Sequence, residues 1–347
     1  MAGPAWVVGP EGSPVSRSVG ARGEFSVTQG SAAAVGVGAR WSAVRRVAGY
    51  AAALSMALYL VVKLVWVAAA LLGHGPDDFG TADWVVLNFV TVVMAATGVA
   101  LGLALAQHWG RRLPAAPVIF FSWVGAGFLV PMLPYALISG ILGAFGGERG
   151  DGGGSDAAPR WETVFITIGF AGMAVGLAVA LPIYLRERWP RAFLGRVGDG
   201  RARPSPVVTV AMAVAAGLGL LWSYRALGGT LGLDPAHRDQ WDLNGRLLNA
   251  NSGLWALLGA WGTWALTHGR PARLRVWIAM TPAYAASGSL FAWSCWKLPM
   301  VIFQPGGFVA AEYTPFAVVQ HVLGIVVGLT LVVAVLRSVP TAPGDSE

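Results

Sequence analysis

Five ionisable side chains lie inside, or at the head of, strongly apolar stretches of this sequence, where a charge is expensive. They are Lys63, Arg225, Lys297, His321 and Glu162. Ionisable groups in membrane-spanning helices usually face protein or water, and they often mark ligand sites or proton paths. The chemistry that such a set supports is binding of a charged ligand, or movement of a proton between neighbouring groups.

Several polar residues share one predicted depth with these charges, near the outer ends of the spans described below. We therefore predict an outward-facing polar pocket that binds a small molecule. Its candidate residues are Lys63, Asn88, Arg225, Asp242, Asn249, Lys297, Glu312, Gln320 and His321.

Lys63 is the deepest charge, since Val61, Val62, Leu64 and Val65 flank it. We expect its ammonium group to have a polar partner. The candidate partners are Asp83, Asp242, Gln320 and His321. An alternative stays open for the basic residues, because long side chains can extend to the interface and pair with acids in the loops. His321 can also be a neutral histidine of the core.

Several types of site are missing from the sequence. It has no Walker phosphate loop, no H-E-x-x-H zinc motif and no G-x-S-x-G elbow. Its single cysteine, Cys295, excludes an internal disulfide and a multi-cysteine metal site. We therefore predict no metal and no cofactor, and ATP-driven pumping by this chain alone is not favoured.

The elements that must position these residues are eight apolar runs of about twenty residues each. A run of about 18 or more apolar residues can cross a membrane as a helix. The chain has 55% hydrophobic and 12% charged residues, against about 25% charged in soluble domains. The predicted fold is all-α, a polytopic transmembrane bundle of about eight spans. The runs cover 49–72, 83–106, 116–143, 162–185, 206–228, 247–267, 276–302 and 314–336.

Proline and glycine predict how some of these helices bend and pack. Pro131 and Pro134 lie in one long run, and Pro282 and Pro299 lie in another, so both helices should kink or tilt. Small residues four apart allow close approach of two helices. The pairs are Gly98 with Gly102 and Gly324 with Gly328.

The basic residues predict the orientation, because cytoplasmic loops carry an excess of Lys and Arg. One side of the predicted topology holds seventeen of the 24 basic residues, and the other side holds four. We therefore place both termini in the cytoplasm of a multi-pass protein of the inner (plasma) membrane. The net charge of +7 is spread over alternate loops beside spans, which argues for a lipid bilayer as partner and against nucleic acid.

The chain divides into five predicted parts, with a repeat of four spans. A shift of 159 residues places Asp83 on Asp242 and Gly110-Arg111 on Gly269-Arg270. An even number of spans per repeat predicts parallel halves about an axis along the membrane normal. The parts are a flexible cytoplasmic tail (1–45), a first four-helix half (46–190), a basic cytoplasmic linker (191–205), a second four-helix half (206–337) and a short C-terminal tail (338–347). Residues 146–159 are predicted to form a flexible external loop.

Residues 224–232, YRALGGTLG, follow an apolar span and precede an acidic loop. This stretch resembles uncharacterised multi-pass membrane proteins of high-GC actinobacteria. The Ala-, Gly-, Arg- and Trp-rich composition fits that source. The resemblance implies the topology, and it transfers no functional residue.

Three functions remain open from the sequence. The first is a transporter, permease or membrane binding component for a small molecule. The second is a membrane-embedded enzyme acting on an isoprenoid or lipid, with Glu162 and Glu312 at the heads of equivalent spans near His321. The third is a non-catalytic protein that holds or regulates a membrane-protein partner.

Overall fold

The computed structural model describes residues 38–74, 81–144, 160–199, 205–236, 241–305 and 308–338. The residues described here belong to one compact unit. Both predicted four-helix halves therefore lie in one unit. Residues 1–37 of the predicted N-terminal tail, the loop 146–159 and the C-terminal tail from residue 339 lie outside the described residues.

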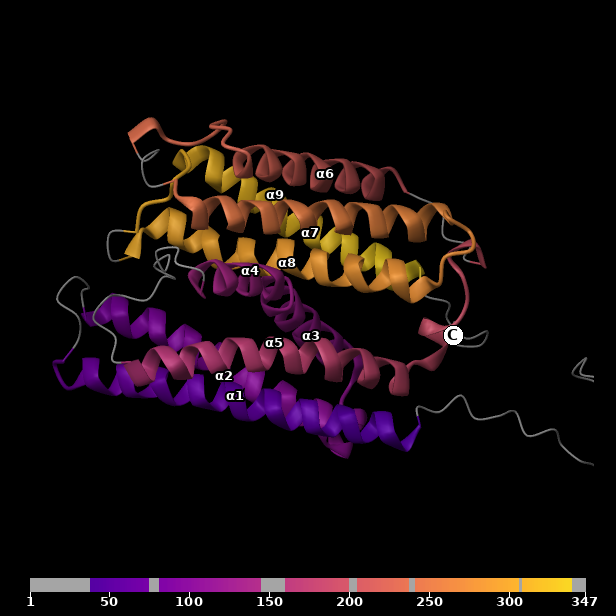
Figure 1. Cartoon of the computed structure of the whole chain (residues 1–347), viewed down its shortest axis with the longest axis horizontal. Helices are drawn as coiled ribbons and strands as arrows, with labels where there is room; N and C mark the ends of the chain where they lie inside the picture. Colours follow the sequence, from indigo (N-terminus) through magenta and orange to yellow (C-terminus); the bar gives the residue numbers. More distant parts are fainter. Residues whose placement is uncertain are drawn as a thin grey trace, which may run out of the picture. The chain divides into compact units, whose positions relative to one another are not determined.

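The described residues form α-helices joined by short 3-10 helices and turns (Figure 1). The α-helices are α1 (Ala39–Leu71), α2 (Thr81–Ala106), α3 (Ala115–Leu129), α4 (Met132–Ala144), α5 (Arg160–Arg188), α6 (Pro206–Ala226), α7 (Leu243–His268), α8 (Val276–Phe303) and α9 (Thr314–Ser338). The 3-10 helices are η1 (His108–Arg112), η2 (Pro190–Phe193) and η3 (Val197–Asp199). The extended pairing in this part of the chain consists of isolated bridges, so the all-α prediction is confirmed.

Six helical segments among the described residues are long and apolar enough to cross a membrane. They are α1, α2, the α3–α4 pair, α5, α6 and α9. The chain is thus a multi-pass membrane protein by the length and composition of its helices. The other two predicted spans, α7 and α8, have 26 and 28 residues but are more polar; α7 carries Asn244, Asn249 and Asn251 near its start. The count of eight spans stays a prediction.

Two helix boundaries differ from the sequence prediction. α1 begins at Ala39 rather than 49, so the predicted end of the tail at residue 45 falls inside a helix. The cause is a packed partner: Arg45 is buried and pairs with Glu187 of α5, with 3.0 Å between Nε and Oε2. The predicted single helix over 116–143 is two helices, because Pro131 and Pro134 remove two backbone N–H groups within one turn. α8 continues through Pro282 and Pro299.

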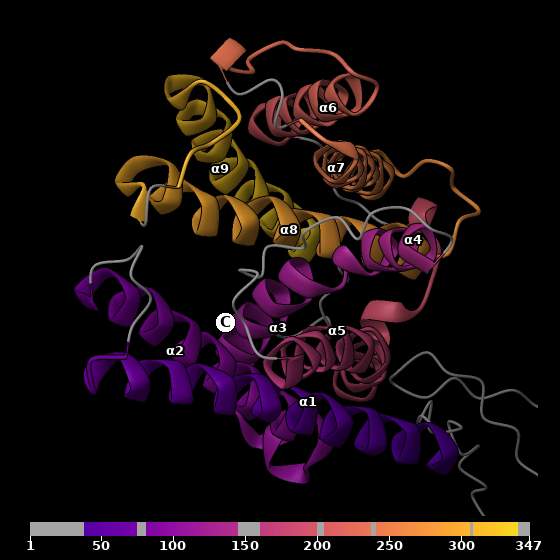
Figure 2. The same ribbon diagram turned by 60° about the vertical axis from the view of Figure 1, so that its left-hand side comes forward.

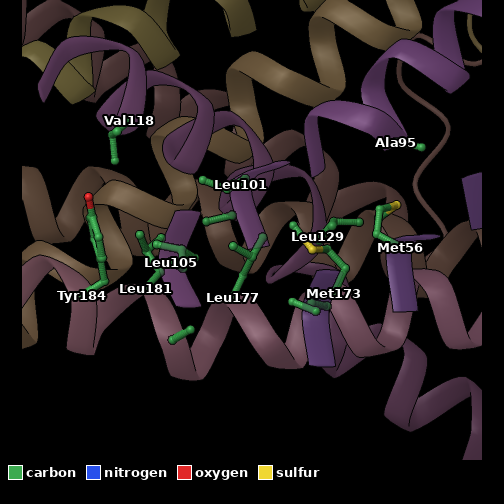
Figure 3. Packing of buried hydrophobic residues seen from close by; sticks show 14 of the residues in the cluster. Met56, Ala95, Leu101, Leu105, Val118, Leu129, Met173, Leu177, Leu181 and Tyr184 are labelled. Carbon is green, nitrogen blue, oxygen red and sulfur yellow. The ribbon is translucent and has the colours of Figure 1, made fainter. Parts of the chain in front are cut away.

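In the first half, α1 packs along both α2 and α5 (Figure 2). Gly49 and Gly102 bring α1 and α2 into backbone contact, and Gly169 and Gly176 do the same between α1 and α5. Gly98 faces Met56. The predicted role of Gly98 and Gly102 in close packing is confirmed. Larger side chains fill the space between these helices, including Leu101, Leu105, Met173 and Leu177 (Figure 3).

In the second half, α7 packs against α6 and α8, and α8 packs against α9. Gly324 and Gly328 of α9 lie against Ser294, Ser287 and Phe291 of α8, as their spacing predicts. The main links between the halves run from α3 to α8 and from α4 to α7. α3 and α4 consequently lie between the α1–α2–α5 group and the α6–α9 group (Figure 1).

The two halves share a pattern of helix neighbours. In each half the first helix contacts the second and fourth, and the third also contacts the second and fourth. The second and fourth contact each other as well. The closest pairs differ, since α1 and α5 are tightly packed whereas α6 and α9 meet less extensively. The internal repeat stays a prediction.

Candidate functional site

Five of the nine predicted pocket residues fall into two separate clusters, one in each half. Lys63 and Asn88 lie together in the α1–α2–α5 group, whereas Arg225, Glu312 and Gln320 lie together at the corresponding end of α6 and α9. Both clusters are near the helix ends at the left of Figure 1, the predicted outer side.

The Lys63 cluster is held by the second and first helices. Lys63 Nζ donates a 3.0 Å hydrogen bond to Oδ1 of Asn88, and Asn88 donates from Nδ2 to the carbonyl of Trp84. The ammonium also lies 4.0 Å from the centroid of the Trp66 ring, a cation–π distance. Asn88 is 1% exposed and Lys63 is half-buried. The ammonium is therefore held by the Asn88 amide on one side and by the Trp66 ring on the other.

A carboxylate whose charge acts on Lys63 is that of Glu162, in the first turn of α5. The close contacts of Gly176 with Ala52, Gly172 with Ser55 and Gly169 with Tyr59 show that α5 runs antiparallel to α1 in a fixed register. Continuing that register outward places Glu162 level with Trp66, about one turn beyond Lys63.

Trp84 of α2 occupies the same level, with its ring centroid 5.5 Å from that of Trp66. The contacts of Gly98 with Met56 and of Gly102 with Ala53 place Asn88 level with Trp66 as well, and the Lys63 ammonium extends to this level.

Lys63 and Glu162 interact through their charges without forming an ion pair. Glu162 is one of the charges that act on Lys63, yet the ion pairs among the described residues do not include either residue. Glu162 is 7% exposed, and within the described ranges its carboxylate has no hydrogen-bond donor. Its oxygens are not among the fully buried atoms that lack a partner, so they are within reach of water or a ligand.

The Arg225 cluster is closed by contrast. Its guanidinium is fully buried, and Nη1 lies 3.1 Å from Oε1 of Glu312 and 3.2 Å from Oε1 of Gln320. Nε donates to the carbonyl of Leu231 at 3.0 Å, and the Phe316 ring covers the group. One acid, one amide and one backbone carbonyl hold Nη1 and Nε of this cation, whereas Nη2 is buried and has no hydrogen-bond partner among the described residues.

The stretch 224–232 is the turn that wraps around Arg225. Gly232 has φ of +77°, and a Cβ there would lie 2.7 Å from Arg225 Nη2 and 2.8 Å from the Phe316 ring. The next residue, Leu233, forms an antiparallel bridge with Glu312. Glycine is required at position 232 because a side chain there would collide with Arg225 and Phe316.

The other predicted pocket residues have separate surroundings. Asp242 is exposed and caps α7 by accepting a 2.8 Å hydrogen bond from the backbone N–H of Gly245. Asn249 donates to the carbonyl of Gly245 within the same helix. Lys297 is exposed, which fits an extended basic side chain at a helix end.

His321 is 5% exposed, and its Nδ1 has no partner among the described atoms. Lys63 is held by Asn88 and Trp66, and not by any of its four predicted partners, Asp83, Asp242, Gln320 and His321.

The break between α3 and α4 is capped from the other half. Trp293 of α8 donates from its indole N–H to the carbonyl of Phe128 at 3.1 Å, and Trp255 of α7 donates to the carbonyl of Pro131 at 3.0 Å. The Trp293 ring stacks on Phe128 with 4.3 Å between centroids. Backbone carbonyls freed at a helix break in lipid need such donors.

No protein-family model, curated protein or solved structure matches this chain. The resemblance of residues 224–232 to actinobacterial membrane proteins therefore stays a prediction.

Sequence reasoning missed the aromatic partner of Lys63. Trp66 follows Lys63 by three residues, a spacing that places two side chains on one face of a helix, so this signal was present. The capping roles of Trp255 and Trp293 had no comparable signal. Each depends on which helix of the other half lies beside the break.

Proposed function

We propose that this protein is a small-molecule binding or permeation component of a membrane. Its site is the cluster of Lys63, Asn88, Trp66 and Glu162, and by the distribution of arginines this cluster faces outward. The proposal keeps the first of the three functions that the sequence leaves open.

The observation that carries it is the difference between the two clusters. Arg225 and Glu312 form an ion pair at 3.1 Å that joins the end of α6 to the segment before α9, as expected of a structural pair. Lys63 and Glu162 have the same opposite charges at the same end of the molecule, yet no ion pair joins them. An unclosed acid and base, both at least partly withdrawn from solvent, provide complementary groups for a polar ligand.

The enzymatic alternative has less support from this geometry. Its two acids belong to different clusters, because Glu312 is bound by Arg225 while Glu162 lies beside Lys63.

The test compares the two lysines of the chain. Purified protein in lipid nanodiscs is heated with a panel of carboxylates, amines, amino acids and phosphate esters, and the unfolding temperature is recorded. We expect at least one class to raise the unfolding temperature of the wild type and of Lys297→Met, the matched control at an exposed site. Lys63→Met should fold as well as the wild type or better, because a costly charge is removed, and should lose the response.

Two results would contradict the proposal. One is a wild-type protein whose unfolding temperature no compound raises. The other is a Lys63→Met variant that responds as the wild type does.

A further inference from the structure

The Lys63 cluster contains one positive and one negative group, and this restricts the ligand that it can accept. Lys63 has three N–H donors, of which one is used by Asn88. Its remaining donors are available to an anionic group. Glu162, in the first turn of α5, supplies acceptors only.

A ligand with a single charge would satisfy one of these groups and be repelled by the other. An anion bound to Lys63 would lie near the Glu162 carboxylate, and a cation bound to Glu162 would lie near the Lys63 ammonium. Both repulsions act in a partly buried environment, where charges interact more strongly than in water. A ligand that carries both charges has neither penalty.

We infer that the site takes a zwitterion, whose carboxylate or phosphate binds Lys63 and whose primary ammonium binds Glu162; this rests on the proposed function. The two protein charges act on each other but lie beyond ion-pair distance. That arrangement suits an acidic group and an ammonium joined by a short chain.

The same chemistry is present in two sources. A free solute such as β-alanine or phosphoethanolamine has it, and so does the headgroup of phosphatidylethanolamine in the bilayer. The experiment therefore tests first whether the ligand needs both charges, and then whether it is a free solute or a lipid headgroup.

Binding is measured by calorimetry on the full chain in phosphatidylcholine nanodiscs, with β-alanine and phosphoethanolamine as probes. Propionate, ethyl phosphate and ethylamine are the single-charge analogues. We expect each analogue to bind at least about tenfold more weakly than its zwitterion, because one buried charge stays unpaired.

The variants assign each end of the ligand. In Lys63→Met, β-alanine should bind no better than ethylamine, and in Glu162→Gln it should bind no better than propionate. Lys63→Arg keeps the charge and should retain the preference for the zwitterion. Lys297→Met should match the wild type throughout.

Nanodiscs containing phosphatidylethanolamine identify the source. If this lipid weakens the binding of phosphoethanolamine, the headgroup is supported as the zwitterion. If phosphoethanolamine binds as tightly as before, a free solute is supported.

The inference is overturned if propionate or ethylamine binds the wild type as tightly as β-alanine does; the proposed function then still stands. If none of the probes or analogues binds the wild type and the wider panel also fails, the proposed function itself falls.

Discussion

Lys63 and Arg225 differ in how the surrounding residues compensate a buried cation. Asn88 and the face of Trp66 hold Lys63 without neutralising it, whereas Glu312 neutralises Arg225 directly. Removing one partner of a buried ion pair leaves an uncompensated charge, which is costlier than removing an unpaired one. The two cations should therefore respond differently to substitution.

For the closed pair, we predict that Glu312→Gln lowers stability by about 2–3 kcal/mol, below the full cost of breaking a buried pair because Glu312 is partly exposed. The measurement is thermal unfolding of the variant in nanodiscs. Asp83→Asn, a neutralised acid on an exposed site at the same predicted side, is the control and should change stability by less than about 0.5 kcal/mol. Equal effects of the two substitutions would show that Arg225 does not depend on Glu312.

At the scale of elements, the break between α3 and α4 is stabilised by the opposite half. Trp293 supplies an indole donor to the Phe128 carbonyl, while Trp296 contacts the same phenyl ring edge-on without a hydrogen bond among the described residues. The two tryptophans are thus alike in type and setting and differ in one hydrogen bond.

We predict that Trp293→Phe destabilises the protein by about 1–3 kcal/mol, because a buried carbonyl loses its donor. Trp296→Phe is the matched control and should cost less than half as much. Comparing the unfolding temperatures of both variants with that of the wild type checks this, and a larger effect at Trp296 would argue against the capping role.

The crossing of α3 and α8 depends on two glycines. A Cβ on Gly127 would lie 2.1 Å from the carbonyl carbon of Gly288, so the backbones touch at this point. The contact fixes where the first half meets the second.

We predict that Gly127→Ala forces α3 and α8 apart and costs about 1–3 kcal/mol. Gly217→Ala and Gly140→Ala lie in helices where a Cβ would meet nothing within 4 Å. They should be neutral or stabilising by up to about 1 kcal/mol, because alanine favours helix over glycine. A neutral Gly127→Ala would mean that the two helices are less tightly packed than their backbones indicate.

At the scale of the whole molecule, the orientation in the membrane rests on the arginines of the loops. Seventeen basic residues fall on one predicted side and four on the other. The residues on the first side are Arg17, Arg22, Arg40, Arg45, Arg46, Arg111, Arg112, Arg186, Arg188, Arg191, Arg196, Arg201, Arg203, Arg270, Arg273, Arg275 and Arg337. The four on the other side are Arg149, Arg160, Arg238 and Arg246.

This asymmetry predicts that Ser155→Cys, in a Cys295→Ala background, reacts with an impermeant thiol reagent in intact cells. Ala202→Cys in the same background should react only after the membrane is opened. The reverse order of labelling would invert the topology and place the Lys63 cluster on the cytoplasmic side.

The sequence by itself determined the helices and the depth of their polar residues. Apolar runs and their interruptions are local properties, so the helices, the proline break and the shared level of Lys63 and Asn88 follow from the order of residues alone. Only the tertiary structure decided which of these residues meet. Lateral contacts depend on which small residues face each other, and the register of Gly169 and Gly176 on α1 placed Glu162 level with Trp66. Because that register joins positions more than a hundred residues apart, a single polar pocket predicted from depth became two clusters, one closed and one open.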